Sequence, residues 1–181
     1  MRICVRYLPV LLALTVAARA ASTEDLLDPH PTARDGISFN LPKAWKERPQ
    51  ETGVPLLVAS PASADTDTTG DYLPVIIIRA TPHAGTAGPI NGDAQQAHVA
   101  SEIKNYDVTE KPQQISVNGL DTVTFGGTFT QGALKLRSRQ YFILANDHLY
   151  ALTIITLAST WDQRLPALEA SVHSFTISAK K

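Results

Sequence analysis

The fold is decided by the stretch YFILANDHLYALTIIT, residues 141–156. Two runs rich in aromatic and β-branched side chains, which favour strands, lie on either side of Asn146-Asp147. Asn and Asp tolerate the left-handed backbone that tight turns require. The stretch therefore predicts two antiparallel strands joined by a short hairpin turn.

Two similar joints precede this hairpin. SVNGLDTVTF, residues 116–125, contains Asn118-Gly119, a strong hairpin signal, and TFTQGALKL, residues 128–136, contains Gln131-Gly132. The segments between the joints are rich in strand-forming residues. Four antiparallel strands are therefore predicted over residues 108–158.

Further strands are predicted towards the N-terminus. Ile37, Phe39 and Leu41 alternate with polar residues, as in a half-buried strand that ends at Pro42. VPLLVAS, residues 54–60, and YLPVIIIRATP, residues 72–82, predict two more. Within the latter, residues 75–78 are apolar on both faces, which predicts a central strand covered on both sides.

Two helices complete the predicted fold. Residues 93–106 place apolar side chains three apart, with Asn91 or Asp93 as the capping residue. A second helix over residues 165–175 has Pro166 in its first turn. The predicted buried stripes are Ala94, Ala97, Val99, Ala100, Ile103 and Tyr106 in the first helix, and Leu165, Leu168, Val172 and Phe175 in the second. The fold class is therefore α+β, an antiparallel β-sheet covered by helices.

The first 20 residues are typical of a secretory signal peptide. Arg2 and Arg6 precede an apolar run over residues 8–18, and Ala18-Arg19-Ala20 has the small-residue pattern of a cleavage site. The run is shorter than the roughly 20 residues that span a bilayer. We therefore expect a periplasmic protein that begins at residue 21 and has no membrane span after cleavage; a retained N-terminal anchor is the alternative.

Composition narrows the function classes. The single cysteine of the 181 residues, Cys4, lies in the leader, so no disulfide or thiolate site is expected after cleavage. The remaining chain has 13 basic and 17 acidic residues, a net charge of −4, which does not favour nucleic acid as a partner. We expect a flexible N-terminal arm over residues 21–35 and a single domain over residues 36–178.

The order of these motifs resembles the PsbP-like family, which includes photosystem II PsbP and DcrB-like bacterial domains. GISFNLPKAW, residues 36–45, is similar to the family's opening pattern G-apolar-S-F-x-x-P-x-x-W. Residues 116–129 and 139–156 resemble its hairpins, and LEASVHSFTI, residues 168–177, resembles its closing helix. The resemblance implies an α/β/α sandwich and a role in binding, stabilisation or adaptation rather than catalysis. It assigns no functional residue to this chain.

One acidic stretch imitates a calcium loop. SADTDTTGDY, residues 63–72, holds Asp65, Asp67 and Asp71 around a glycine. A calcium loop of the EF-hand type needs an Asp or Asn where Thr69 lies and a bidentate Glu where Ile76 lies. The pattern favours a polar turn between strands, and a weak calcium site formed by the three carboxylates stays open.

No catalytic motif is present in the sequence. The five histidines lack zinc-ligand spacing, and the chain contains neither G-x-S-x-G nor a phosphate-binding glycine loop. We therefore expect no catalytic residues, no cofactor and no enzymatic activity. A hydrolase with unrecognised catalytic residues is the alternative from another class.

The candidate binding residues lie on one predicted strand. Lys135, Arg137 and Arg139 alternate, so they share one face of the sheet, and Tyr141 continues that face. This predicts either a solvated polar face with acidic or threonine neighbours, or a docking surface for an acidic protein or a lipid head group. The function expected from the sequence is an exported, non-catalytic accessory protein of the cell envelope that acts through protein–protein contact. A periplasmic immunity or effector-handling protein is the alternative.

Overall fold

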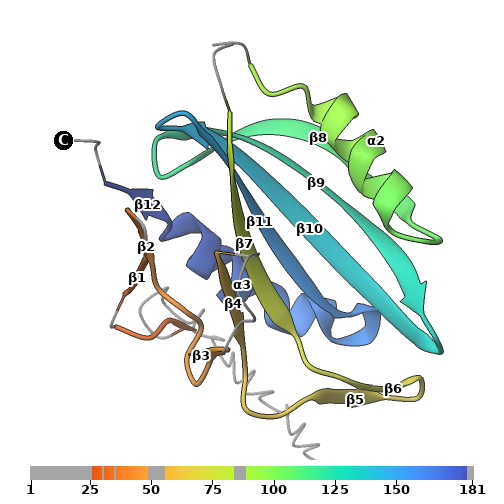
Figure 1. Cartoon of the computed structure of the whole chain (residues 1–181). Helices are drawn as coiled ribbons and strands as arrows, with labels where there is room; N and C mark the ends of the chain where they lie inside the picture. Colours follow the sequence, from red (N-terminus) through yellow and green to blue (C-terminus); the bar gives the residue numbers. More distant parts are fainter. Residues whose placement is uncertain (1–25, 30, 35, 49–55, 84–88, 179–181) are drawn as a thin grey trace, which may run out of the picture.

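A computed structural model describes residues 26–29, 31–34, 36–48, 56–83 and 89–178. Its main element is a seven-stranded antiparallel sheet in the order β3-β4-β7-β11-β10-β9-β8 (Figure 1). The strands are β3 (Lys46–Glu47), β4 (Leu57–Ser60), β7 (Val75–Pro82), β8 (Asp107–Val117), β9 (Leu120–Gln131), β10 (Leu134–Ala145) and β11 (His148–Leu157). The predicted run of four antiparallel strands is confirmed as β8 to β11.

Tight turns join these four strands at the predicted positions. Asn118 and Gly119 have φ angles of 50° and 82°, and Asn146 and Asp147 have φ angles of 49° and 60°. These left-handed values match the right-handed twist of the flanking strands. Gly132, in the third turn, has a φ of 62°. The hairpin predictions are therefore confirmed.

A small second sheet closes one side of the molecule. It consists of β1 (Thr32–Arg34), β2 (Ile37–Phe39) and β12 (Thr176–Ile177), in the order β1-β2-β12. Residues 32–34 were predicted to belong to the flexible arm, whereas in the structure β1 pairs with β2 along its length. Leu27, also in the predicted arm, is buried and forms a bridge to Pro42. This part of the arm therefore belongs to the fold.

The first helix differs from its prediction. Helix α2 (Gly92–Glu102) begins with the Asn91 side chain accepting a hydrogen bond from Ala94 N at 3.0 Å, which confirms one of the two predicted caps. It ends four residues earlier than expected, and none of its residues is buried. Ala94 and Ala97 are exposed and Ala100 is partly buried, whereas Val99 packs against a hydrophobic cluster of the sheet and Gln96 donates a hydrogen bond to the backbone of β8. The predicted alanine stripe was wrong.

The C-terminal helix begins earlier than expected. Helix α3 (Trp161–His173) follows a short 3-10 turn, η1 (Ala158–Thr160), and Trp161 at its start is buried. Pro166 therefore lies in the second helical turn, not the first. The buried stripe is confirmed: Leu168, Val172 and Phe175 are buried, and Leu165 packs against the same core.

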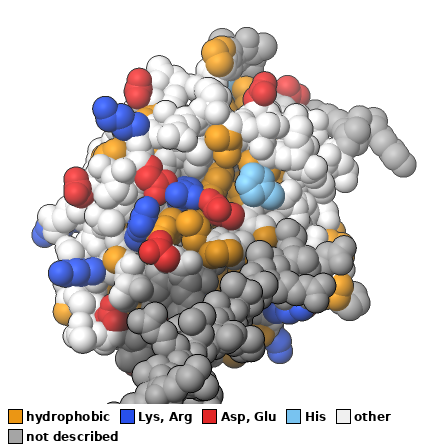
Figure 2. All heavy atoms as spheres, turned by 180° about the vertical axis from the view of Figure 1, so that it is seen from behind, with side chains coloured by type: hydrophobic (Ala, Val, Ile, Leu, Met, Phe, Trp, Pro, Cys, Tyr) orange, Lys and Arg blue, Asp and Glu red, His pale blue; other side chains and the backbone are white. Residues whose placement is uncertain are grey.

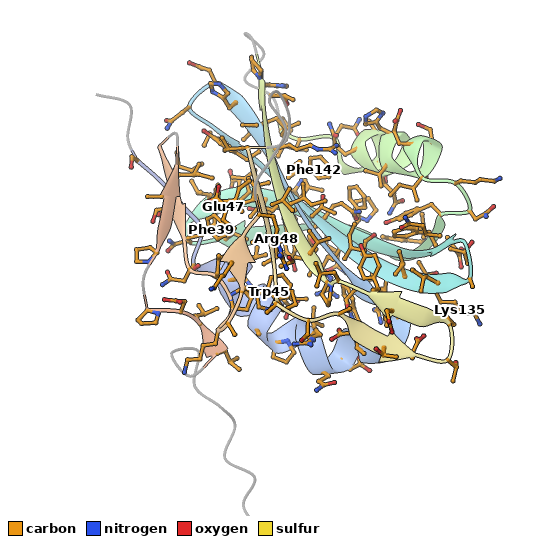
Figure 3. The ribbon with its side chains drawn as sticks, turned by 60° about the horizontal axis from the view of Figure 1, so that its bottom comes forward. Phe39, Trp45, Glu47, Arg48, Lys135 and Phe142 are labelled. Carbon is orange, nitrogen blue, oxygen red and sulfur yellow. The ribbon has the colours of Figure 1, made fainter. Side chains whose placement is uncertain are left out.

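The two sides of β10 belong to two separate hydrophobic clusters. Tyr141 and Ile143 lie in the larger one, with residues of β4, β7, β11 and α3. Phe142 points the other way and stacks on Phe125 in a smaller cluster that reaches Val99 of α2. The larger cluster also contains Trp45, which is 6% exposed and closes the opening pattern GISFNLPKAW (Figure 3).

The strand predicted to be covered on both sides, β7, is covered on one. Ile76 and Ile78 are buried, whereas Val75 and Ile77 on the other face are only partly buried. The cause is that α2 packs over β8 and β9, at the other end of the sheet (Figure 1). The fold is a mostly antiparallel sheet with two helices, and a sandwich fully covered by helices on both faces stays an expectation.

The predicted leader lies outside the described residues. Within the part of the chain that the structure describes, no helix combines the length and apolar character needed to cross a membrane.

Candidate binding groove

A groove of about 760 Å³ lies on the face of β8, β9 and β10 that borders α3. Its lining combines a few apolar side chains with carboxylates, cations and hydrogen-bonding groups. These residues are Thr109, Glu110, Lys111, Gln113, Ile115, Thr124, Phe125, Arg139, Tyr141, Glu169 and His173. Figure 2 shows interleaved acidic and basic side chains around a hydrophobic patch on the side of the molecule turned away in Figure 1. We call this feature the groove.

The charged centre of the groove is formed by one carboxylate and two arginines. Glu110 on β8 accepts hydrogen bonds from Arg139 Nε at 2.7 Å and Arg139 Nη2 at 2.9 Å, a bidentate geometry. It also accepts one from Arg137 Nη2 at 2.7 Å. Glu110 and Arg139 are 23% and 18% exposed, so water only partly screens their attraction.

A glycine between the partners makes this contact possible. Gly126 on β9 pairs with Glu110 on one side and with Arg139 on the other. A Cβ atom at Gly126 would lie 2.9 Å from Glu110 Oε2 and 2.9 Å from a backbone oxygen of β10. The missing side chain therefore leaves the space in which Glu110 reaches across β9 to the arginines. A bulge in β8 beside Glu110 adjusts its position further.

Helix α3 supplies the other wall and a second carboxylate. Arg139 Nη1 donates a hydrogen bond to Glu169 of α3. The guanidinium carbons of Arg137 and Arg139 lie 4.6 Å and 5.6 Å from the ring centroid of Trp161 at the start of the helix. Cation–π contacts of this length attract the two guanidinium groups to the ring of Trp161. The arginines thus link the sheet to α3 through Glu169 and the ring of Trp161.

The network fixes the charge of its members. Burial opposes ionisation of Glu110, but the hydrogen bonds from Arg139 and Arg137 outweigh it and hold the pKa of the carboxyl below its ordinary value. For Arg139, burial favours the neutral form, and contact with Glu110 outweighs it and raises the pKa. Burial raises the pKa of Tyr141 to about 12. Glu110 and Arg139 are therefore ionised and Tyr141 is neutral at physiological pH.

The four predicted binding residues do not form one open basic surface. Lys135 is exposed at the far end of the sheet, away from Trp45 (Figure 3). Arg137 and Arg139 point to the predicted face but are paired within the molecule. Tyr141 is 2% exposed, so its ring is not available as a surface anchor. Glu110 is the acidic neighbour that the sequence predicted for a solvated polar face.

The acidic stretch forms the hairpin of β5 (Asp65–Asp67) and β6 (Gly70–Tyr72), and its carboxylates bind protein groups. Asp65 accepts hydrogen bonds from Thr160 on η1 and from Arg164 on α3. Burial would raise the pKa of Asp65, but these bonds outweigh it and lower the pKa. Asp65 is therefore an ionised anchor that ties the hairpin to the C-terminal helix.

The other two carboxylates of the hairpin have different partners. Asp67 accepts hydrogen bonds from Ser159 and Thr69, which lower its pKa to about 2. Asp71 accepts one from Thr66 at 2.7 Å, and these two residues lie opposite each other in the hairpin. Because side chains alternate between the two faces of a strand, Asp71 lies on the face opposite to Asp65 and Asp67. Among the described residues, no three acidic, histidine or cysteine side chains gather as metal ligands. The geometry argues against the weak calcium site.

Solved structures of other proteins share this fold. LpqN, described as involved in cell envelope biogenesis of Mycobacterium tuberculosis, superposes with a TM-score of 0.60 at 13% identity, over 86% of this chain and 94% of LpqN. Cyanobacterial PsbP from Synechocystis gives a TM-score of 0.55 at 16% identity, over 83% and 92% of the two chains. The chain has a PsbP-like fold. This confirms the resemblance noted in the sequence.

A third PsbP-like neighbour comes from a eukaryote. The Saccharomyces cerevisiae Ran-binding protein Mog1p matches with a TM-score of 0.53 at 14% identity, over 78% of this chain and 90% of Mog1p. No protein-family model and no curated protein sequence matches the chain. At these identities the likeness shows the PsbP-like fold alone, because one fold supports many functions.

Proposed function

We propose that the chain is an exported, non-catalytic binding protein of the cell envelope that acts through protein–protein contact, with the groove as its contact site. The observation that carries the proposal is the groove itself. It has a volume of about 760 Å³, it combines Ile115 with hydrogen-bonding groups such as Gln113 and Thr124, and its central charges are held in place by the network around Glu110. Such a mixture of apolar and polar groups is typical of protein contact surfaces.

The neighbours with the same fold support a binding role. The Mog1p structure is described as a Ran-binding protein, and LpqN as involved in cell envelope biogenesis. The envelope location rests on the leader over residues 1–20, with its apolar run and Ala18-Arg19-Ala20 site. Cell fractionation and N-terminal sequencing of the isolated protein test this part of the proposal. A mature protein beginning at residue 21 in the periplasmic fraction supports it, and an uncleaved cytoplasmic protein contradicts it.

Neighbouring glutamines on β8 allow a matched test of the groove. Gln113 lines the groove and pairs with Thr124, whereas Gln114 pairs with Val123, whose side chain belongs to the cluster near α2. Both glutamines are exposed, and adjacent strand residues point to opposite faces. A photo-crosslinking amino acid at either position therefore samples a different side of the same strand.

The crosslinking experiment is carried out in cells that export the full chain. We expect a discrete protein adduct from position 113 and a much weaker one from position 114. Loss of the adduct at high salt is also expected, because charged groups border the contact. Equal adducts from both positions would exclude the groove as the contact site, and no adduct from either would contradict the protein-binding function.

A further inference from the structure

We infer that the partner segment bound in the groove is acidic, and that one of its carboxylates replaces Glu169 on Arg139. This inference rests on the proposed function and specifies the chemistry of the partner. It makes Glu169 an internal competitor, which occupies the position of the partner's carboxylate while the groove is empty.

The charges at the centre of the groove balance only while Glu169 stays on Arg139. Arg137 and Arg139 contribute two positive charges, and Glu110, shared by both, contributes one negative charge. Glu169 supplies the second negative charge through Arg139 Nη1. When Glu169 turns into solvent, Arg139 keeps Glu110 as its partner and one positive charge is left at the centre, which a carboxylate from outside can neutralise.

The two glutamates are held very differently. Glu110 accepts three hydrogen bonds from the arginines and is 23% exposed. Glu169 makes a single contact to Arg139 and is 37% exposed, so it loses less when it turns into solvent. Glu169 is therefore the exchangeable partner of Arg139, and Glu110 is the fixed one.

The rest of the groove suits an acidic polypeptide segment. Lys111 is exposed and adds a positive charge to the lining of the groove. Thr109, Gln113 and Thr124 offer hydrogen bonds along the strands to the amide groups of an extended chain. Ile115 provides an apolar contact for one of its side chains.

The test uses two fluorescein-labelled, N-acetylated octapeptides and fluorescence anisotropy. One alternates serine with glutamate and the other alternates serine with glutamine. The variant Glu169→Gln in the full-length exported protein frees Arg139 from its internal competitor. The matched control is Glu102→Gln, which makes the same charge change at the exposed end of α2, on another part of the surface.

We expect Glu169→Gln to bind the glutamate peptide about two- to five-fold more tightly than the unmodified chain, the size of a partly exposed ion pair. The glutamine peptide should gain nothing, and Glu102→Gln should match the unmodified chain. Adding Arg139→Lys to Glu169→Gln should remove the gain, with thermal melting used to verify that this variant is folded.

Four results would overturn the inference. They are equal affinity of Glu169→Gln and Glu102→Gln, an equal gain with the glutamine peptide, no binding of the glutamate peptide by any variant, and, when the same variants are sedimented with phosphatidylglycerol vesicles, a gain seen only with the vesicles. The crosslink from position 113 distinguishes failure of the acidic partner from failure of the proposed function. A groove-specific adduct together with any of these results leaves the proposed function standing and removes only the acidic partner.

Discussion

Replacement of Glu110 by glutamine should reveal how strongly the groove's central network holds the fold. The change keeps the shape of the side chain but removes the charge that three hydrogen bonds from Arg137 and Arg139 satisfy. Hydrogen bonds to charged groups contribute about 1.5–3 kcal/mol, whereas exposed ion pairs contribute about 0.2–1 kcal/mol. Because these three side chains are 18–30% exposed, we expect the free energy of unfolding to fall by about 2 kcal/mol.

Urea denaturation at pH 7 measures this loss, and a thermal scan should show Tm lower by about 4–8 °C for a chain of this size. The control is Glu102→Gln at the exposed end of α2, which should change the free energy of unfolding by less than about 0.5 kcal/mol. If Glu110→Gln behaves like this control, the network does not stabilise the fold and the reasoning fails.

The pH dependence gives a second check of the same variant. The pKa of Glu110 is lowered in the folded protein, so its contribution is complete above the ordinary value of 4.5 and is lost as the pH falls through the folded value. The difference in stability between the unmodified chain and Glu110→Gln should therefore be constant above about pH 5 and shrink below pH 4.5. A difference that grows on acidification would contradict the assigned ion pairs.

Four further variants each change a single side chain. Gly126→Ala should lower the free energy of unfolding, measured by urea denaturation, by about 1–3 kcal/mol, because its Cβ would lie 2.9 Å from Glu110 and from a backbone oxygen. An unchanged free energy of unfolding would show that the neighbouring groups move aside without cost. Trp45→Ala should cost about 3–5 kcal/mol, and an unchanged Tm would remove Trp45 from the core. The exposed Lys135→Glu should change the free energy of unfolding by less than about 0.5 kcal/mol. Arg137→Glu, which places a carboxylate against Glu110, should be clearly destabilising by the same denaturation assay; equal behaviour of these last two variants would contradict the pairing.

The features that the sequence predicts well are local ones. Asn118-Gly119 and Asn146-Asp147 specify the backbone angles of their turns, and the turns in turn specify which strands pair. The C-terminal stripe of Leu168 and Val172 is also local, since helical spacing alone brings these side chains to one face. Each of these predictions needs only residues that are close together in the chain.

The features that the sequence does not reveal depend on contacts between distant segments. Strand β1 exists because β2 lies beside it, and β2 is held on its other side by β12, which follows the last helix. Tyr106 was assigned to a helix stripe, but its ring lies over Gly127, where a Cβ atom would be 2.4 Å away. The pattern of residues around Tyr106 does not indicate that a glycine on β9 leaves space for its ring.

The candidate site shows the same division. Alternation correctly placed Arg137 and Arg139 on one face, because a strand fixes the direction of its side chains. Their partner Glu110 lies two strands away, and its reach depends on Gly126 and on a bulge in β8, which has no sequence signal of its own. A glycine in the middle of a strand, directly opposite a predicted charge, is the one clue that could have indicated a crossing side chain.

The pairing of the arginines also changes the kind of recognition that this face can perform. An open row of like charges attracts any acidic partner from a distance, and such attraction is screened strongly by salt. In the groove, Glu110 and Glu169 neutralise both arginines, so little net charge is available for long-range attraction. A partner gains from Arg139 only when its carboxylate takes the place of Glu169 at close range. The network therefore favours selectivity over attraction, because an acidic segment of the wrong shape meets two carboxylates and no unpaired cation at the centre of the groove.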